Sequence, residues 1–298
     1  MEGEQFPSVY LEFPLIGTPF LDVTTLYSKL ATGTCIDSDA VSGMGPLINW
    51  FADTCSELED VCFGFELDTK NPALPRAAVH FQPVNHLELV EPFFSVLGEP
   101  DRAALYLDLE KRMPKGWSLS FFGLFRGRAG SPLRVCGYIT AAEARACAAN
   151  PSHIGDIFEE VGFKAYDDDM LERLSSIIGI APKSIDFQFD VYDDGHFGET
   201  FAIDVQLAIE QPDEVRKSFA MGPASRVMGM LESWEVADGR WKLAADAAFA
   251  RSIPVEADEG GVARYALSLM PQWVKARWTD GVLQPAKLYF YAYAGLLS

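Results

Sequence analysis

The feature that most constrains this chain is a pairing of β-strand patterns that recurs along its length, with helical patterns in between. Within each pair, apolar and polar residues alternate in two segments joined by a turn-rich connection, which indicates a β-hairpin. The hairpins are 61–67 with 77–82, 118–124 with 133–139, 184–192 with 201–209, and 273–278 with 286–293. A strand at 9–13 belongs to a fifth, partial unit. Because units that recur in this way usually pack against one another, we expect one domain, 1–298.

Helical patterns fill the intervals between the hairpins. Helices are predicted over 21–30, 47–58, 86–97, 100–112, 141–148, 154–161, 170–178, 212–219, 225–234 and 242–250. Each predicted strand has one apolar face, such as the face formed by Phe201, Ile203 and Val205. An apolar face must be covered, and the helices are the available cover. The sequence therefore predicts an α+β fold with an antiparallel sheet.

The opposite faces of the strands are polar, and they carry tyrosines beside charges of both signs. The tyrosines are Tyr138, Tyr192, Tyr289, Tyr291 and Tyr293. One interpretation is an open antiparallel sheet with helices on one face and water on the other. The other is a closed β-barrel surrounded by helices, in which about eight to ten strands leave room for a ligand chamber. A solvated face would be richer in Lys, Glu and Thr, so the barrel is favoured.

The charge of the chain excludes several classes of partner. With 24 basic and 43 acidic residues the net charge is −19. Such a surface repels phosphate backbones and anionic lipids, so we expect neither nucleic acid nor a membrane as a partner. The five cysteines are scattered and form no CxxC pair, which argues against a disulfide framework. Together with an N-terminus unlike a signal peptide, this predicts a cytoplasmic protein.

Basic residues fall on the polar faces of strands from separate parts of the chain. They are Arg134, Lys275, Arg277 and Lys287. Converging cations suit a diphosphate, because they neutralise the leaving group as its bond breaks. Alternatively, these cations pair with Asp186, Asp190 and Asp204 on the predicted strands. The sequence leaves these two interpretations equal.

Other polar side chains in the predicted strands and helices are candidates for catalysis or metal binding. Glu66 lies on the polar face of its strand, where a carboxylate inside a chamber could act as a general base. The pattern alone favours a surface carboxylate near a strand end. His80 falls on the polar face of its strand and could touch a ligand. The four histidines form no HxH or HExxH pattern, so a structural metal is not expected. The acidic run 167–169 opens a predicted helix, which favours a capping role over a metal site.

Short segments carry a resemblance to a known family. Residues 118–124, followed by a basic turn and 133–138, are similar to the second barrel hairpin of the ABBA-type (PT-barrel) prenyltransferases. Residues 65–68, followed by Arg76 and Phe81, are similar to the first hairpin, and 286–291 resembles the last strand. Within this family the chain looks most like the peptide-modifying enzymes of cyanobactin pathways.

The resemblance implies a ten-stranded barrel and a transferase. A dimethylallyl or geranyl group would move from its diphosphate to an aromatic acceptor, either a small molecule or a peptide side chain in a natural-product (RiPP) pathway. Glu66 would take the acceptor's proton. Arg76 and His80 would touch the diphosphate, with Lys275 and Lys287 behind it. The tyrosines would shield the allyl cation, because the faces of aromatic rings stabilise cations.

An acidic triplet does not fit this picture well. Asp186, Asp190 and Asp204 would be unusual in a diphosphate chamber. They could hold Mg²⁺, which prefers carboxylate oxygens, or the chamber could bind a different ligand. The alternative function is therefore a non-prenylating peptide-tailoring or peptide-recognition protein of a RiPP pathway, because a fold does not fix a function. Its acidic strands would bind a basic peptide segment.

Overall fold

The structure is a computed structural model, and it describes most of the chain. The described residues are 8–27, 45–55, 58, 62–67, 78–83, 85–125, 130–207, 209, 211–256 and 262–297. The strands are β1 (Ser8–Pro14), β2 (Asp22–Tyr27), β3 (Cys62–Leu67), β4 (Ala78–Gln82), β5 (Trp117–Phe125), β6 (Leu133–Ile139), β7 (Ile185–Val191), β8 (Phe197–Gln206), β9 (Phe249–Glu256), β10 (Val262–Thr279), β11 (Val282–Leu283) and β12 (Lys287–Leu297). The helices are α1 (Gly45–Cys55), α2 (Val90–Val96), α3 (Pro100–Arg112), α4 (Ala141–Ala149), α5 (Pro151–Val161), α6 (Asp168–Ile180), α7 (Pro212–Met221), α8 (Pro223–Ser233) and α9 (Ala244–Ala247).

The strands form one antiparallel sheet that closes on itself. The hydrogen-bonded order runs from β1 through β2 to β8, and β1 pairs on its other side with β12, which pairs with β10. β8 also pairs with β10, so the two ends of this order meet. In the described part of the chain, β1 to β8, β10 and β12 therefore form a ring of ten strands. The barrel prediction is confirmed, and the open-sheet alternative is wrong.

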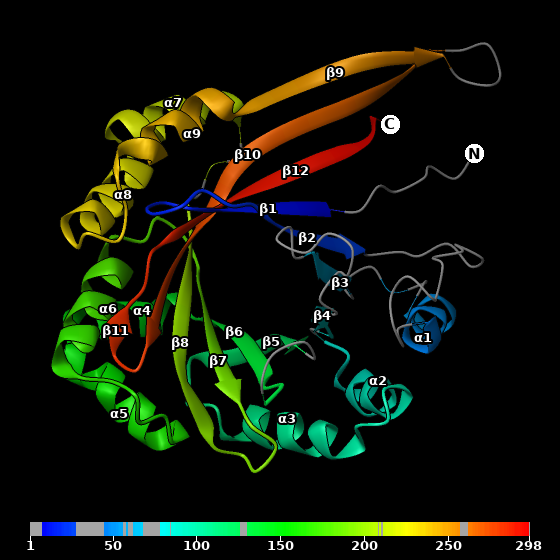
Figure 1. The fold of residues 1–298 in the computed structure, drawn as a ribbon, viewed down its shortest axis with the longest axis vertical. Helices are drawn as coiled ribbons and strands as arrows, with labels where there is room; N and C mark the ends of the chain where they lie inside the picture. Colours follow the sequence, from blue (N-terminus) through cyan, green and yellow to red (C-terminus); the bar gives the residue numbers. More distant parts are fainter. Residues whose placement is uncertain are drawn as a thin grey trace.

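The helices surround the barrel, and the hydrophobic core lies between the two layers. Figure 1 shows the helices around the outside of the ring, with α4 to α6 in one group and α7 to α9 in the next. Phe122 points outward from β5 and stacks on Phe94 of α2, with ring centroids 4.9 Å apart. It also contacts Phe93 and Tyr106, and all four side chains are at most 1% exposed. This aromatic cluster joins α2 and α3 to the sheet.

Most predicted helices are confirmed, and two of them, α5 and α6, are preceded by a residue whose side chain caps the N-terminus. The Asp167 carboxylate accepts a hydrogen bond from the backbone N–H of Met170 at 2.8 Å and so caps α6. The capping role expected for the run 167–169 is thereby confirmed. Asn150 caps α5 in the same manner, through the backbone N–H of Ser152. No described helix is both long enough and apolar enough to cross a membrane.

Two helix predictions were wrong in whole or in part. Residues 22–27 form strand β2 rather than a helix, because they pair on one side with β1 and on the other with β3. Their β-branched residues Val23, Thr24 and Thr25 favour this extended state. The prediction over 242–250 holds only for α9, after which β9 begins at Phe249. β9 pairs with the part of β10 that extends past the barrel, and Figure 1 shows this arm projecting from the ring.

The aromatic cluster gives a prediction for stability. Replacing Phe122 with Ala should lower the free energy of unfolding by about 3–5 kcal/mol, because the change removes a buried ring and leaves a cavity. Urea unfolding measures this loss. The matched control is Met221→Ala, at a helix position that is 86% exposed, where a change within about 0.5 kcal/mol is expected. An equally small loss for Phe122→Ala would contradict the described packing.

Candidate active site

The barrel holds a cavity of about 620 Å³. Its lining comes from alternate positions of the strands, as shown by Arg134, Cys136 and Tyr138 on β6. The residues between them, such as Val135, face the helices and are buried. The period of two that was read from the sequence thus separates a polar lumen from an apolar outer layer. Both aromatic and charged side chains line this lumen.

Arg134 is held by a carboxylate from the neighbouring strand. Its Nε and an Nη donate hydrogen bonds to the two carboxylate oxygens of Asp190, at 2.8 and 3.1 Å. The guanidinium also lies 4.4 Å from the centre of the Phe125 ring. Both charged side chains are 13% exposed. A two-pronged pair of this kind fixes both groups in place.

A second group of polar side chains surrounds Asp204 on β8. Lys275 Nζ lies 3.6 Å from Asp204 Oδ2, and Gln188 Nε2 donates to the same oxygen at 2.5 Å. Asp204 Oδ1 is buried and has no hydrogen-bond partner among the described residues. Burial raises the pKa of Asp204, although Lys275 opposes the shift. Asp186 lies directly opposite Asp204 on β7, and its pKa is raised to about 7, mainly by burial and then by the Asp204 charge.

Lys287 is held between two carboxylates. Its Nζ donates to Glu12 Oε2 at 2.9 Å and to Asp22 Oδ2 at 3.0 Å. Burial alone would lower the pKa of Lys287, but Glu12 and Asp22 outweigh it and raise the pKa. Glu12 comes from β1, the strand that was expected at 9–13 in a fifth, partial unit. Arg134 and Lys275 therefore pair with carboxylates of the expected triplet, Asp190 and Asp204. Lys287 also pairs with carboxylates, but these are Glu12 and Asp22, which lie outside that triplet.

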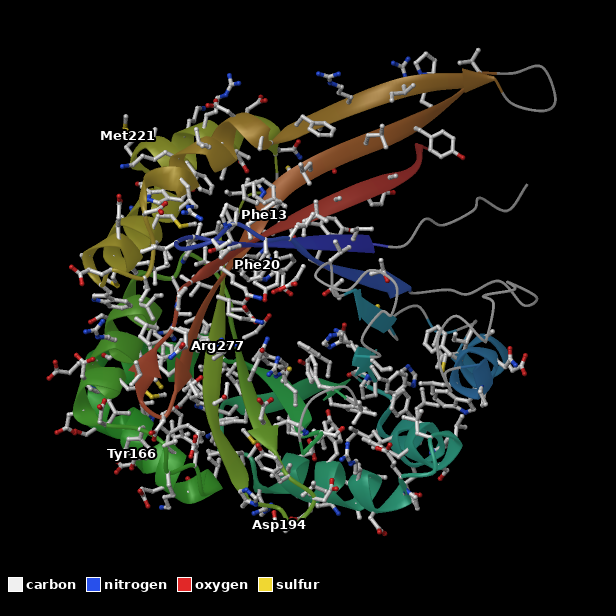
Figure 2. The ribbon with its side chains drawn as sticks, viewed as in Figure 1. Phe13, Phe20, Tyr166, Asp194, Met221 and Arg277 are labelled. Atoms are coloured by element: carbon white, nitrogen blue, oxygen red, sulfur yellow. The ribbon has the colours of Figure 1, made fainter. Side chains whose placement is uncertain are left out.

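Arg277 differs from the other lumen cations. It lines the cavity two residues beyond Lys275 on the same face of β10. No carboxylate of the described residues lies within ion-pair distance of its guanidinium. Figure 2 labels Arg277 beside the strands, well away from Asp194 in the β7–β8 turn. Among the lysines and arginines that line the cavity in the described part of the chain, Arg277 is therefore the one without a carboxylate partner.

The predicted tyrosines divide into two groups. Tyr138 and Tyr289 line the cavity, and Lys275 Nζ lies 4.9 Å from the centre of the Tyr289 ring. Tyr192 instead stacks on His196 at the β7–β8 turn, with ring centroids 4.6 Å apart. Two further tyrosines continue the inward face of β12 beyond the cavity lining, Tyr291 and Tyr293. The structure therefore brings only some of the expected chamber residues together.

The residues singled out in the first hairpin are only partly described. His80 lines the cavity, as expected. Glu66 pairs in the backbone with Thr24 and Ala78, but its side chain lies outside the described part of the structure. Arg76 lies outside the described residues altogether. The roles of these three residues remain predictions.

The acidic triplet is largely occupied by protein groups. Asp190 holds Arg134, and Asp204 holds Lys275 and Gln188. In the described part of the chain, the oxygens of these three carboxylates do not come close enough together to hold one metal ion between them. These contacts favour ion pairing over Mg²⁺ at the triplet. Magnesium dependence remains a prediction.

Several lining residues were missed in the sequence. They are Tyr10, Glu12, Gln188 and Trp273. Tyr10 and Glu12 alternate on β1, so the strand predicted at 9–13 already placed them on one face. The missing information was the pairing of β1 with β12, which brings Tyr10 to 5.2 Å from Tyr291 between ring centres. Such long-range pairings are not encoded in local alternation.

The comparisons with known proteins concern the fold. No family model and no curated protein matches the sequence. Among solved structures, 5-dimethylallyltryptophan synthase from Streptomyces coelicolor matches with a TM-score of 0.53 and 14% identity, over 96% of this chain and 80% of that one. The apo form of the prenyltransferase PriB matches with a TM-score of 0.53 and 15% identity, over 96% and 79%. The NotF prenyltransferase matches with a TM-score of 0.52 and 11% identity, over 97% and 80%.

This chain has the ABBA-type prenyltransferase fold. The expected resemblance is thus confirmed at the level of the fold, over nearly the whole chain. At 11–15% identity the three structures do not carry residue roles across. The nearer likeness to cyanobactin-pathway enzymes remains a prediction.

The environment of Asp186 gives a prediction for pH dependence. Between pH 4 and 7 the folded state binds the Asp186 proton that the unfolded state has released, because the folded pKa is about 7 against a usual value of 3.8. Stability should therefore fall as the pH rises through this window. Asp186→Asn should flatten the fall and make the protein more stable above pH 7, by at most about 4 kcal/mol. Urea unfolding from pH 4 to 8 measures both effects.

The matched control for this titration is Asp194→Asn. Asp194 is exposed in the β7–β8 turn, and hydrogen bonds from His196 lower its pKa. Above about pH 5 it is therefore charged in both the folded and the unfolded state, so its replacement should leave the slope that comes from Asp186 unchanged. A slope as steep in Asp186→Asn as in the wild type would contradict the raised pKa of Asp186.

Proposed function

We propose that this chain is a prenyltransferase that moves a dimethylallyl or geranyl group from its diphosphate to an aromatic acceptor inside the barrel. The observation that carries the proposal is the lumen itself, a cavity of about 620 Å³ in an ABBA-type barrel, lined by cations and aromatic rings together. Ligand pockets in proteins commonly have about 300–1,000 Å³. The proposed co-substrate is the prenyl diphosphate, and the acceptor is an aromatic small molecule or a peptide side chain.

The cations of β10 and β12 form the proposed diphosphate site. Lys275 pairs directly with Lys287 across these strands, and Arg277 follows on the same face. A diphosphate placed there would gain the uncompensated charge of Arg277. It would also share the two lysines with their present carboxylates. Such fixed positive groups stabilise the diphosphate as the allylic C–O bond breaks and the electron pair leaves with it.

Aromatic rings would stabilise the allyl cation that remains. Tyr289 already lies over the Lys275 ammonium at 4.9 Å, so its ring face is presented to positive charge within the lumen. Tyr138 and Trp273 add further aromatic surface to the lining. An aromatic carbon of the acceptor then attacks the cation, and a base must take the proton from the acceptor. By the resemblance described above, we assign this base to Glu66.

A second candidate function rests on the carboxylates. Glu12, Asp186, Asp190 and Asp204 equal the lumen's basic side chains in number, and Asp204 Oδ1 is buried without a partner in the described residues. Because its carboxylates are as numerous as its basic side chains, the lumen could bind a positively charged group. The alternative is therefore a peptide-tailoring or peptide-recognition protein of a RiPP pathway that binds a cationic peptide segment without a prenyl donor.

The donor site is tested by thermal unfolding with non-reactive donors. Dimethylallyl or geranyl thiodiphosphate, at about a hundred times its dissociation constant, should add roughly 2.7 kcal/mol of stability. This should raise the melting temperature by a few degrees. Arg277→Met should lose most of the rise, because it removes the uncompensated lumen cation. The matched control, Arg251→Met on the exposed arm strand β9, should keep it.

The outcomes distinguish the two functions. No shift with either donor, in a protein that unfolds cooperatively, would refute the prenyl-donor site. Binding of a lysine-rich peptide that weakens with salt would then support peptide recognition. An equal shift in wild type and Arg277→Met would place the diphosphate elsewhere in the barrel.

The proposed base has its own test. Glu66→Gln should abolish prenyl transfer to an accepted aromatic substrate, because the amide cannot take up the acceptor's proton. The melting temperature and the donor-induced shift should stay close to those of the wild type. Product formation is followed by mass spectrometry. An unchanged rate would remove Glu66 from the mechanism and leave the donor site intact.

A further inference from the structure

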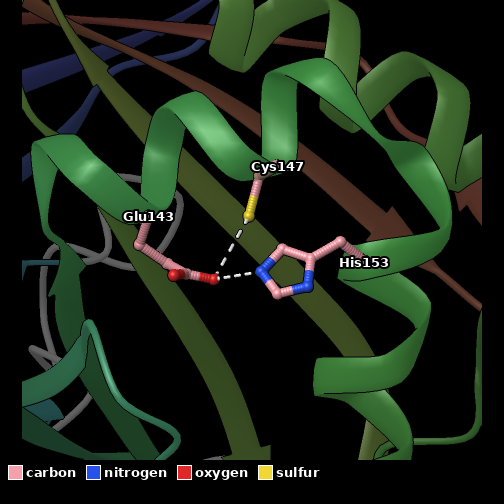
Figure 3. A group of neighbouring side chains, drawn as sticks. All are labelled: Glu143, Cys147 and His153. Atoms are coloured by element: carbon pink, nitrogen blue, oxygen red, sulfur yellow. Dashed lines mark hydrogen bonds and ion pairs between the residues drawn. The ribbon is translucent and has the colours of Figure 1, made fainter.

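Three side chains with metal-binding atoms meet on the outer helices, outside the lumen. Glu143 and Cys147 lie one turn apart on α4, and His153 lies in the first turn of α5. His153 Nε2 is 2.5 Å from Glu143 Oε1, and Cys147 Sγ is 4.0 Å from the same oxygen. All three ligand atoms lie within 4.8 Å of one another. Figure 3 shows the three side chains converging on one point between the helices.

The backbone fixes this arrangement. Positions four apart on a helix share a face, so Glu143 and Cys147 point the same way. Asn150 ends α4 and caps α5, accepting a hydrogen bond from Ser152 through its side chain. The backbone N–H of His153 also donates to the Asn150 carbonyl at 3.1 Å. This tight connection folds the first turn of α5 back toward α4, which is why no linear zinc pattern appears in the sequence.

The three side chains of the cluster offer the ligand types of a zinc site. Burial, then the Glu143 carboxylate, raises the pKa of the Cys147 thiol to about 12. Among the described residues of the cluster, one imidazole faces a carboxylate and a buried sulfur. A divalent cation would be neutralised by one thiolate and one carboxylate, with a neutral imidazole as third ligand. Carboxylate, imidazole and thiolate are all zinc ligands, at about 2.0–2.3 Å from the ion.

We propose that Glu143, Cys147 and His153 form a zinc site that joins α4 to α5. Binding breaks the Cys147 S–H bond and releases its proton to solvent, while sulfur, one Glu143 oxygen and His153 Nε2 form bonds to the ion. The Glu143–His153 distance must open and the sulfur must approach, by about 1 Å each, to reach the spacing of tetrahedral ligands. His153 is partly exposed, with 36% of its side chain accessible, so we assign the fourth position to a water molecule.

The helix that carries two of the ligands exposes most of its residues to solvent. All nine residues of α4 are described, and Cys147 is the one that is buried. Its neighbour Ala148 contacts α6 through a hydrogen bond from Ser175. An ion that ties α4 to α5 would add a cross-link where apolar burial is small. This inference does not depend on the proposed prenyl transfer, because the cluster lies on the helices and outside the cavity lining.

The test uses the full chain, stripped of metal by a chelator and then titrated with Co²⁺ and Zn²⁺. Cobalt should bind with one equivalent and produce a thiolate-to-cobalt charge-transfer absorption together with the visible bands of a tetrahedral ion. Zinc should displace it and raise the melting temperature by a few degrees at a hundredfold excess over its dissociation constant. Cys147→Ala should abolish the charge-transfer band. His153→Gln should lower the affinity for the metal at least about tenfold. Replacing a residue that only hydrogen-bonds to a metal ligand already has an effect of this size.

Matched controls separate this site from adventitious binding. Cys55→Ala removes a different buried cysteine, and His196→Gln removes a histidine paired with a carboxylate at the surface. Both should keep the cobalt spectrum and its stoichiometry. If a ligand variant does not unfold cooperatively without metal, Glu143→Gln replaces it. A wild-type protein without the charge-transfer band, or a band that persists in Cys147→Ala, would overturn the proposal.

Discussion

Seven residue pairs between β8 and β10, from Gln206 opposite Trp273 to Thr200 opposite Thr279, join the two ends of the sheet. Without this pairing the same strands would form a curved sheet with two long free edges, which attract further strands. With it, the polar faces look inward onto one another across a lumen. Every later property of the molecule depends on this closure, because it turns a solvated face into a partly buried one. The carboxylates and cations of that face then act on each other at short range.

Closure also explains the charge pattern of the lumen. A charge removed from water is costly unless it is paired. Arg134 is paired with Asp190, and Lys287 with Glu12 and Asp22. Asp204 must share Lys275 with the nearby Asp186, so one carboxylate is favoured in its protonated form. A diphosphate that binds in this lumen would therefore have to displace carboxylates from the cations, because most of the cations are already paired. Arg277 has no such partner among the described residues and is exposed to solvent, so a diphosphate could meet its charge without displacing a carboxylate. For that reason it decides between the two proposed functions.

Local alternation in the sequence was sufficient for part of this fold. The hairpins at 118–139 and 184–209 were predicted because each strand has one apolar face, formed by residues such as Phe187 and Ile203. β2 was mistaken for part of a helix over 21–30, because the local pattern does not show the pairing of this segment with β1 and β3. Alternation placed Lys287 and Asp204 on lumen faces, but it could not tell which charges meet. Glu12 and Lys287 are 275 residues apart, and only the closed sheet brings them together.

The helical layer shows the same limit at short range. Glu143 and Cys147 could be placed on one helix face from their spacing, yet His153 joins them only because the chain turns sharply at Asn150. A search for linear metal motifs therefore fails where a search for shared helix faces across a short turn would succeed. The two layers also differ in what an added charge would do. In the lumen, a ligand competes with ion pairs between side chains, whereas between α4 and α5 a cation would replace the Cys147 proton and enter between Glu143 and His153. Binding in the lumen should therefore be selective for shape and charge distribution, and binding at the helices should be governed by ligand chemistry alone.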